Sequence, residues 1–91
     1  MVGNFRYRGL EELYRTGTTR RIGADLVRKC IRILQLLEVA ERPEEMNIAG
    51  FHFHGLQGKP KHWSVRVIKN YRVTFGWLAG DAVDLDHEDY H

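Results

Sequence analysis

The pattern of hydrophobic and polar residues divides the chain into a helical first half and a second half of β-strands. Between residues 24 and 40, apolar residues recur every three or four positions, which places them on one face of an α-helix. That apolar face is formed by Val27, Cys30, Ile31, Leu34 and Leu37. The opposite, polar face is formed by Asp25, Arg28, Lys29, Arg32, Gln35 and Glu38. The spacing predicts an amphipathic helix whose apolar face packs on a sheet.

Three shorter elements are predicted around this helix. Residues 4–7 are predicted as a short strand, and residues 9–15 as a short helix. The short helix should end at Gly17, because glycine readily adopts the left-handed conformation that ends many helices. Residues 17–19 then form a loop. Residues 43–46 begin with proline and are predicted as one further turn of helix.

Beyond Gly50, apolar and polar residues alternate with a period of two, which is the period of a half-buried β-strand. Strands are predicted over residues 51–54, 62–67 and 71–77 and from residue 82 onward. Short connections, including a hairpin turn at Gly80-Asp81, make neighbouring strands antiparallel. The sequence therefore predicts an α+β fold, in which two N-terminal helices pack on a small, mainly antiparallel sheet. A single domain should span residues 1–91.

Alternation along residues 71–77 assigns these side chains to the two faces of the sheet. One face is formed by Tyr71, Val73, Phe75 and Trp77. We expect this aromatic face to pack on the helices. Arg72 then lies on the open face, which can form a cleft together with the C-terminal segment.

The composition is typical of a globular domain in a reducing compartment. Cys30 is the one cysteine, so no internal disulfide can form. Its place on the apolar helix face favours a packing role over a nucleophilic one. No apolar stretch is long enough for a transmembrane helix or a signal peptide. We therefore expect a cytoplasmic protein that has no membrane partner.

The net charge of +2 is distributed unevenly along the chain. Residues 59–72 include five basic and no acidic residues, whereas residues 81–89 include five acidic residues and no lysine or arginine. A third zone, again basic, contains Arg15, Arg20, Arg21, Arg28, Lys29 and Arg32. Clustered cations bind phosphates, so the basic zones fit either a polyanion or an ordinary solvated surface. The acidic C-terminal segment argues against a uniform coat of nucleic acid.

The chain ends in His87-Glu88-Asp89-Tyr90-His91, and each of these residues carries a side chain that can transfer a proton. Cleavage of a phosphodiester without a metal needs a base, an acid and cations that stabilise the phosphate charge. In RNA, the 2′-hydroxyl can itself be the nucleophile. Groups of these types are provided by His54, Arg72, Tyr90 and His91.

The histidines offer a weaker, metal-binding alternative. His52 and His54 lie two residues apart and would emerge on the same face of a strand, as zinc ligands can. No established ligand spacing accompanies them, and no glycine-rich phosphate loop is present. The sequence predicts neither a metal nor a cofactor.

Short motifs over nearly the whole chain form a combination that is more specific than any of its parts. The second half contains Phe53-His54-Gly55-Leu56-Gln57-Gly58, Trp63-Ser64-Val65, Asn70-Tyr71-Arg72-Val73-Thr74-Phe75, Gly80-Asp81-Ala82 and Asp89-Tyr90-His91. The first half contains Phe5-Arg6, Gly9-Leu10, Leu13-Tyr14, Gly17-Thr18 and the segment 40–46. Together these motifs resemble the HigB family of bacterial toxins, which belongs to the RelE/ParE superfamily.

The resemblance implies a RelE-like, microbial-ribonuclease-like fold and an endoribonuclease that cleaves mRNA in the ribosomal A site. By position in the motifs, Arg72 would stabilise the phosphate in the transition state and Tyr90 would stack on or act near the scissile nucleotide. His54, Asp89 and His91 would complete the catalytic cluster. The cations expected to bind RNA are Lys59, Lys61, Arg66 and Lys69.

The implied partners are the 70S ribosome with its mRNA and a cognate helix-turn-helix antitoxin of the HigA type. Operator DNA would be contacted only through that antitoxin. The basic side chains of the long helix could contact ribosomal RNA or an acidic antitoxin surface, or could simply be solvated.

Two positions depart from the family pattern. Gln57 stands where the family often has a lysine, and Ile68 stands where some members have a basic residue. Glutamine can neither carry a charge nor transfer a proton, so Lys59, Lys61 or Lys69 could act as the cation or proton-transfer group instead. Two alternatives follow: an inhibitor that occupies the ribosome or poisons gyrase without cleavage, and a plain RNA- or protein-binding module.

Overall fold

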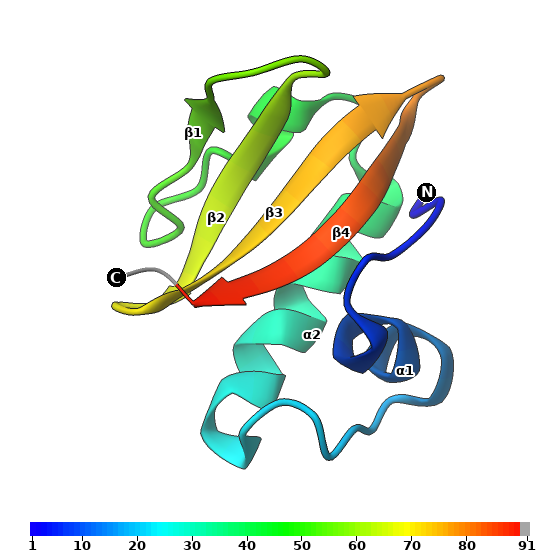
Figure 1. Cartoon of the computed structure of the whole chain (residues 1–91), viewed down its shortest axis with the longest axis vertical. Coiled ribbons are helices and arrows are strands. Elements are labelled where there is room, and N and C mark those ends of the chain that lie inside the picture. The colour runs from blue at the N-terminus through cyan, green and yellow to red at the C-terminus, as the bar shows by residue number, and fades with distance from the viewer. Residues whose placement is uncertain (90–91) are drawn as a thin grey trace.

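A four-stranded antiparallel sheet carries two helices on one of its faces in the computed structural model, which describes residues 1–89 (Figure 1). The elements in chain order are α1 (Arg8–Thr16), α2 (Ala24–Val39), a short 3-10 helix η1 (Pro43–Met46), β1 (His54–Leu56), β2 (His62–Ile68), β3 (Tyr71–Leu78) and β4 (Asp81–Asp89). The strands lie in the order β1-β2-β3-β4. This arrangement confirms the predicted α+β fold, with two N-terminal helices on a small antiparallel sheet.

Helix α1 packs Leu10 and Leu13 into the core and ends where the sequence predicts. Gly17 has a φ of 83° and donates its N–H to the carbonyl of Leu13, 2.9 Å away. This left-handed residue satisfies a carbonyl at the helix end, and residues with a Cβ adopt the conformation only at a cost. The loop that follows leads directly into α2.

Helix α2 packs on the sheet along a line slightly different from the predicted one. Leu26 and Ile33 are buried, at 7% and 0% exposure, whereas Val27 and Ile31 are only partly buried. The buried face of α2 is therefore shifted by about one residue from the apolar face that the sequence predicts. The helix contacts both α1 and the sheet, so its apolar stripe is wider than a single face. Cys30 is fully buried, as expected for a packing residue, and burial raises the pKa of its thiol to about 11.

The strand predicted over residues 4–7 is absent, and this prediction was wrong. The N-terminal segment instead runs parallel to β4 and makes only isolated bridges, from Val2 to Ala82 and from Phe5 to Leu85. Between these bridges, the Asn4 side chain replaces a backbone partner, because its Oδ1 accepts the N–H of Asp84 at 2.6 Å. Asp84 has a φ of 55°, which interrupts the regular ladder that a paired strand would need.

The strand predicted over residues 51–54 begins later than expected, at His54. His52 has a φ of 47°, in the left-handed region, so the backbone cannot continue as an extended strand through it. Phe51 still borders the sheet, because its carbonyl accepts the N–H of Arg66 at 2.6 Å. His52 and His54 therefore do not share the face of one strand.

The hairpin between β3 and β4 fixes which side chains face the helices. The turn consists of Ala79 and Gly80, one residue earlier than the predicted Gly80-Asp81, because Asp81 already pairs with Leu78 as the first residue of β4. Both turn residues have positive φ, at 53° and 85°, as in the two-residue hairpin turns that match strand twist. Val73 and Phe75 are fully buried beneath the helices. The predicted facing of β3 is confirmed, and Arg72 belongs to the opposite, open face. None of the described helices is long and apolar enough to span a membrane.

Candidate active site

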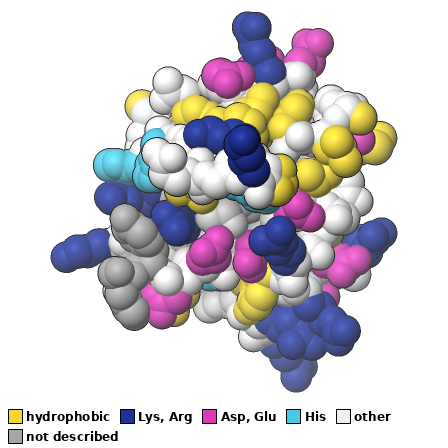
Figure 2. All heavy atoms as spheres, turned by 45° about the horizontal axis from the view of Figure 1, so that its top comes forward, with side chains coloured by type: hydrophobic (Ala, Val, Ile, Leu, Met, Phe, Trp, Pro, Cys, Tyr) yellow, Lys and Arg dark blue, Asp and Glu magenta, His cyan; other side chains and the backbone are white. Residues whose placement is uncertain are grey.

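The open face of the sheet carries a row of three charged side chains across its strands. Arg66 on β2 pairs with Arg72 on β3, and Arg72 pairs in turn with Glu88 on β4. Two arginines directly opposite each other repel, so this pairing costs free energy unless an anion lies between them. Figure 2 shows histidine side chains beside Lys and Arg side chains on one flank of the molecule. A phosphate is the kind of group that would offset this positive potential.

Arg72 is held against β4 by Glu88. Its Nη2 lies 3.9 Å from Glu88 Oε1, and the Arg72 side chain is only 21% exposed. The other carboxylate oxygen, Glu88 Oε2, accepts a hydrogen bond from Thr74 Oγ1 at 2.6 Å. Thr74 is itself buried, at 4% exposure, so its hydroxyl is a fixed donor. Thr74 and Glu88 together restrict where the Arg72 guanidinium can lie.

His54 contributes an imidazole next to this row. Its Nδ1 lies 3.2 Å from the carbonyl oxygen of His52, and its Nε2 lies 3.4 Å from Ser64 Oγ. A carbonyl can only accept, so we assign the proton of the neutral ring to Nδ1. Nε2 then carries the lone pair, and Ser64 donates weakly to it. This nitrogen is the one available to take a proton from a substrate.

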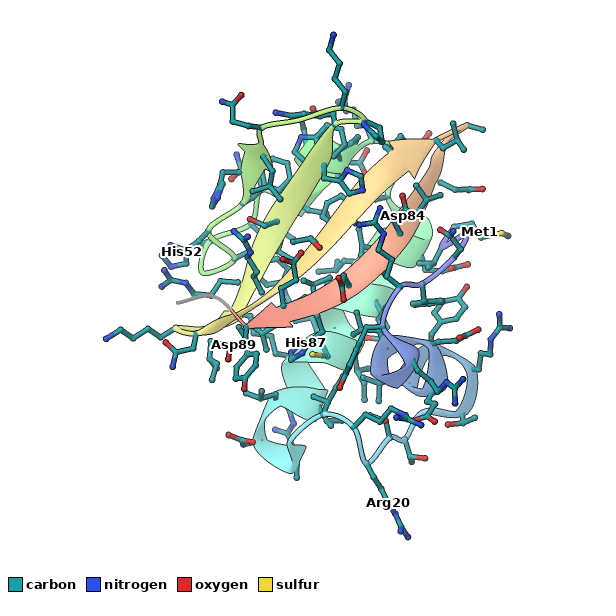
Figure 3. The ribbon with its side chains drawn as sticks, viewed as in Figure 1. Met1, Arg20, His52, Asp84, His87 and Asp89 are labelled. Atoms are coloured by element: carbon teal, nitrogen blue, oxygen red, sulfur yellow. The ribbon has the colours of Figure 1, made fainter. Side chains whose placement is uncertain are left out.

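One small pocket brings together residues from β1 and the loop before it, from β2, from the β2–β3 turn and from β3. It is lined by His52, His54, Ser64, Arg66, Ile68, Lys69, Tyr71 and Arg72. Figure 3 shows His52 on the flank of β1 and Asp89 at the end of β4, close to the β2–β3 turn. The structure therefore places His54, Arg66, Lys69 and Arg72, four of the residues selected from the sequence, around one pocket.

The other two selected lysines lie away from this pocket. Lys61 Nζ donates to the carbonyl of Leu56 at 3.0 Å and occupies the space where Gly55 would carry a Cβ, only 2.6 Å from that position. Gly55 pairs with Trp63, which packs on the core, so Lys61 is drawn to the side of β1 opposite His54. Lys59 is exposed in the β1–β2 loop.

Lys69 is the lysine best placed to replace the cation missing at position 57. Gln57 is exposed just after β1, and Ile68 is 43% exposed at the end of β2. The pairing of β2 with β3 shifts register between Arg66 and Ile68, which changes the facing of the residues that follow. Lys69 consequently lines the pocket beside Arg72.

Asp89 borders a second hollow, of about 410 Å³, on the helix side of β4. His87 lies in its wall, stacked on Tyr71 with ring centroids 5.0 Å apart and on Tyr7 at 5.7 Å. Burial lowers the pKa of His87, and the nearby Asp86 carboxylate opposes that shift only in part. Tyr90 and His91, which the sequence selects as catalytic, lie outside the described residues.

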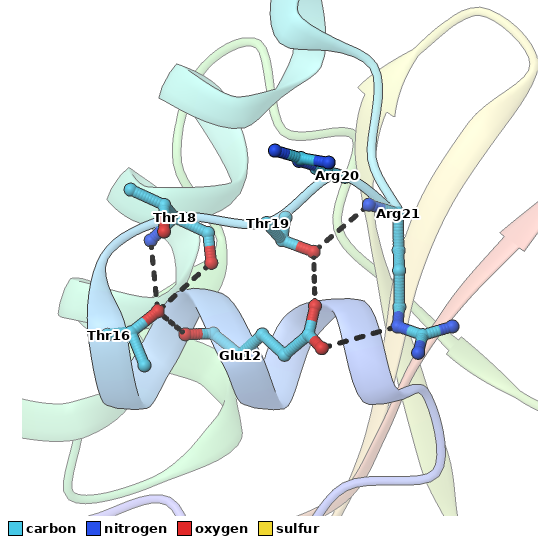
Figure 4. A pocket seen from close by; sticks show the side chains of 6 residues that line it. All are labelled: Glu12, Thr16, Thr18, Thr19, Arg20 and Arg21. Atoms are coloured by element: carbon cyan, nitrogen blue, oxygen red, sulfur yellow. Dashed lines mark hydrogen bonds and ion pairs between the residues drawn. The ribbon is translucent and has the colours of Figure 1, made fainter.

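Another hollow, of about 680 Å³, lies between α1 and the loop that leads to α2 (Figure 4). Several of its polar side chains hydrogen-bond to one another. Glu12 accepts hydrogen bonds from Thr19 Oγ1 at 2.7 Å and from Arg21 Nε at 3.4 Å. The hydrogen bond from Thr19 lowers the pKa of Glu12. These contacts hold the loop, and no histidine lines this hollow, so we assign it no catalytic role.

Sequence reasoning missed Ser64, Thr74 and Glu88. The sequence places Thr74 on the open face by alternation, but the Glu88 contact depends on the β3–β4 pairing. That pairing shifts register between Thr74 and Gly76. Alternation along β4 could have shown that Glu88, and not Asp89, shares a face with Asp86. Among residues 1–89, no three His, Cys, Asp or Glu side chains gather in a group that could hold a metal ion.

Comparison with known proteins agrees with the fold and with the motifs. The family model described as "RelE-like toxin of type II toxin-antitoxin system HigB" matches residues 3–91. A Proteus vulgaris protein named "Endoribonuclease HigB" is 35% identical over 92 residues, which cover 100% of both chains. "Toxin HigB-1" of Vibrio cholerae serotype O1 is 33% identical over 95 residues, covering 99% of this chain and 100% of the relative. This chain therefore belongs to the HigB family of RelE-like toxins of type II toxin-antitoxin systems.

Proposed function

We propose that this toxin is an endoribonuclease that cleaves mRNA in the ribosomal A site and so inhibits translation. The observation that carries the proposal is the meeting of His54, Arg66 and Arg72 at one pocket of the open sheet face. The name of the Proteus vulgaris relative, an endoribonuclease aligned over the full length of both chains, supports the same reaction. A proton-accepting nitrogen and two cations are two of the three kinds of group that phosphodiester cleavage requires, the third being an acid.

The proposed reaction is a transfer within the RNA strand. The 2′-oxygen attacks the adjacent phosphorus while a base takes its proton, and the bond from phosphorus to the 5′-oxygen breaks. An acid protonates the departing 5′-oxygen, which leaves a 2′,3′-cyclic phosphate and a 5′-hydroxyl. Among the residues that the structure describes, His54 is the candidate for the base. Its Nδ1 faces the His52 carbonyl, which leaves the lone pair on Nε2 to accept the proton.

Arg72 and Arg66 would stabilise the charge that builds up on the phosphate. Their opposed positions on β2 and β3 bring two guanidinium groups to one place, and arginine presents a planar pair of donors to phosphate oxygens. In this proposal, Tyr90 and His91 complete the site from the C-terminal segment, with Tyr90 stacked on or acting near the scissile nucleotide. Asp89 would act from the adjoining hollow on the helix side of β4, which shares Ile68 and Tyr71 with the pocket. The nucleophile belongs to the substrate, so the reaction is written without a cofactor.

The remaining residues and partners follow from the same proposal. Lys59, Lys61, Arg66 and Lys69 would contact RNA, and Lys69 is the lysine nearest the reacting phosphate. The chain would act as a single domain in the cytoplasm. Membership of a toxin-antitoxin family implies an antitoxin. We propose that this antitoxin is a helix-turn-helix protein of the HigA type and that it alone contacts operator DNA.

The decisive experiment adds the purified protein to translating ribosomes and maps the ends of the mRNA. Discrete cuts within codons, absent with Arg72→Ala, are the expected result. Stalled ribosomes on intact mRNA would contradict the proposal and indicate an inhibitor that does not cleave. An Arg72→Lys variant serves as a matched control for charge, and circular dichroism verifies that each variant is folded.

A further inference from the structure

We infer that the RNA-binding surface continues from the pocket onto α2, where Lys29 and Arg32 bind phosphates of the same RNA. The inference rests on the proposed function and assigns it two additional contacts. These residues lie on the helix, outside the sheet face that carries the pocket. The occupant is therefore a strand of RNA that extends past the edge of the sheet.

Both cations are held over one buried aromatic ring. Lys29 Nζ lies 5.2 Å from the centre of the Phe51 ring, and the Arg32 guanidinium carbon lies 5.9 Å from it. Phe51 is 4% exposed, so the ring is a fixed platform. Lys29 Nζ also donates to the carbonyl of Gly50 at 3.2 Å. An ordinary surface lysine loses conformational freedom when it binds, whereas Lys29 is already partly ordered.

The same short segment joins this cation pair to the pocket. The carbonyl of Phe51 accepts the N–H of Arg66 at 2.6 Å, and Arg66 Nη1 lies 3.4 Å from His52 Nε2. Arg66 and His52 both line the pocket. The charge of Arg66 also reaches Lys29: burial is the larger cause that lowers the pKa of this lysine, and Arg66 is the next. One short segment and the repulsion between Arg66 and Lys29 therefore connect the cation pair on α2 with the pocket.

These cations differ from four other arginines of the described chain in having no carboxylate partner. Arg6, Arg15, Arg21 and Arg42 each form an ion pair with a carboxylate. Within residues 1–89, Lys29, Arg32 and Arg66 form none, although Asp25 lies one turn before Lys29 on α2.

Grouped like charges without counterions destabilise the folded protein, and a polyanion would offset that cost. An acidic protein surface could also supply the charge. Continuity with the paired arginines of the pocket favours one polymer of phosphates that serves both places.

The test compares two double variants that remove the same charge. Lys29→Gln/Arg32→Gln removes the cation pair on Phe51. Arg8→Gln/Arg20→Gln is the control, because Arg8 and Arg20 are exposed and form no ion pair within the described chain. Figure 3 shows Arg20 pointing away from the sheet, far from His52. The probe is a fluorescent single-stranded RNA with methylated 2′-hydroxyls, which cannot be cleaved, and binding is followed by anisotropy over a range of salt concentrations.

The Lys29/Arg32 variant should bind about tenfold more weakly and lower the slope of log affinity against log salt by about 1.4, or about 0.7 for each lost phosphate contact. The control should change affinity less than about twofold. Equal effects of the two double variants, or no effect of either, would overturn the inference. A charge-preserving variant, Lys29→Arg/Arg32→Lys, should bind like wild type, and binding as weak as that of the glutamine variant would overturn it too.

Two further measurements separate this inference from its alternatives. If the glutamine variant loses affinity for the antitoxin but keeps wild-type RNA affinity, the surface is a protein docking site and the inference fails. mRNA end mapping with the wild-type protein tests the proposed function on its own. If wild-type protein cleaves and the glutamine variant binds RNA normally, only the inference fails. If wild-type protein neither binds nor cleaves RNA, the proposed function fails with it.

Discussion

Thr74 donates a hydrogen bond of 2.6 Å to Glu88, and this buried hydroxyl fixes the carboxylate that lies against Arg72. A negative side chain beside the proposed phosphate site is unexpected, because it would repel the substrate. The second carboxylate oxygen of Glu88 lies 3.9 Å from the Arg72 guanidinium, so this side chain can position Arg72. Glu88 can hold Arg72 in the orientation that the phosphate needs, at some cost in RNA affinity.

Thr74→Val should lower kcat for mRNA cleavage by about tenfold, equivalent to about 1.4 kcal/mol of transition-state stabilisation. The variant removes the donor that positions Glu88 and keeps the shape of the side chain. Thr74→Ser retains the hydroxyl and should restore kcat to within about twofold of wild type. Equal kcat values for the valine and serine variants would show that the hydroxyl has no part in the reaction.

Glu88→Gln should lower kcat without raising KM. The amide can still accept from Thr74, so the fold at this point is kept, but the attraction for Arg72 is lost. Loss of the negative charge should leave RNA binding unchanged or tighter. A purely structural defect would impair both constants, so a raised KM would contradict a positioning role. Single-turnover kinetics over a range of ribosome concentrations separates the two constants.

Gln57→Lys should raise the rate of cleavage, up to about fivefold, because an exposed charge near a phosphate contributes about 0.2–1 kcal/mol. Lys69→Ala should lower the rate, since Lys69 lines the pocket beside Arg72. Lys61→Ala is the matched comparison and should cost less activity, because the Lys61 ammonium is bound to the Leu56 carbonyl on the other side of β1 and any RNA contact it makes lies away from the reacting phosphate. If Lys61→Ala costs more activity than Lys69→Ala, the assignment of the substituting cation is wrong. Initial rates of mRNA cleavage supply the comparison.

The sequence predicts those features that depend on local periodicity. The helices and the facing of Arg72 follow from spacing within single segments, and the antiparallel order of the strands follows from the short connections between them. The contact between Glu88 and Arg72 does not, because it depends on the pairing of two strands, whose register shifts between Thr74 and Gly76. The positive φ of His52 is likewise set by the fold around it, and it moves the start of β1 to His54.

Tyr14→Phe should lower the free energy of unfolding by about 1 kcal/mol. Tyr14 donates a 2.6 Å hydrogen bond to Glu38 Oε1, and the same oxygen accepts the N–H of Val2 at 3.2 Å. The Tyr14 hydrogen bond is the largest cause that lowers the pKa of Glu38. The stability from this pair is therefore present above the ordinary glutamate pKa and is lost as the pH falls below it. Urea unfolding should show a shallower loss of stability in acid for the variant, and an unchanged acid profile would contradict this account.

Deletion of Tyr90 and His91 should abolish growth inhibition and leave the fold intact. The pairing of β3 with β4 reaches the partners Tyr71 and Asp89, so the deletion keeps every strand pairing that the structure describes. In the proposed reaction, those residues supply the group that acts on the scissile nucleotide. Growth of cells that express the truncated toxin is the first measurement, and thermal unfolding of the purified protein verifies its fold. Undiminished toxicity of a folded truncated protein would remove Tyr90 and His91 from the mechanism.

His87 should make the folded protein less stable in mild acid. Burial between Tyr7 and Tyr71 lowers the pKa of His87 in the folded protein below its ordinary value of about 6.5. At a pH between these two values, His87 is protonated in the unfolded chain but neutral in the folded chain. Stability from this residue is thus complete above about pH 6.5 and falls as the pH falls toward the folded pKa. His87→Phe keeps an aromatic ring in the stack and should reduce the difference in unfolding free energy between about pH 7.5 and about pH 5.5. His52→Gln, a change at an exposed histidine, should leave that difference as in wild type. Urea unfolding at the two pH values measures it, and an equal pH dependence in wild type and His87→Phe would show that another group is responsible.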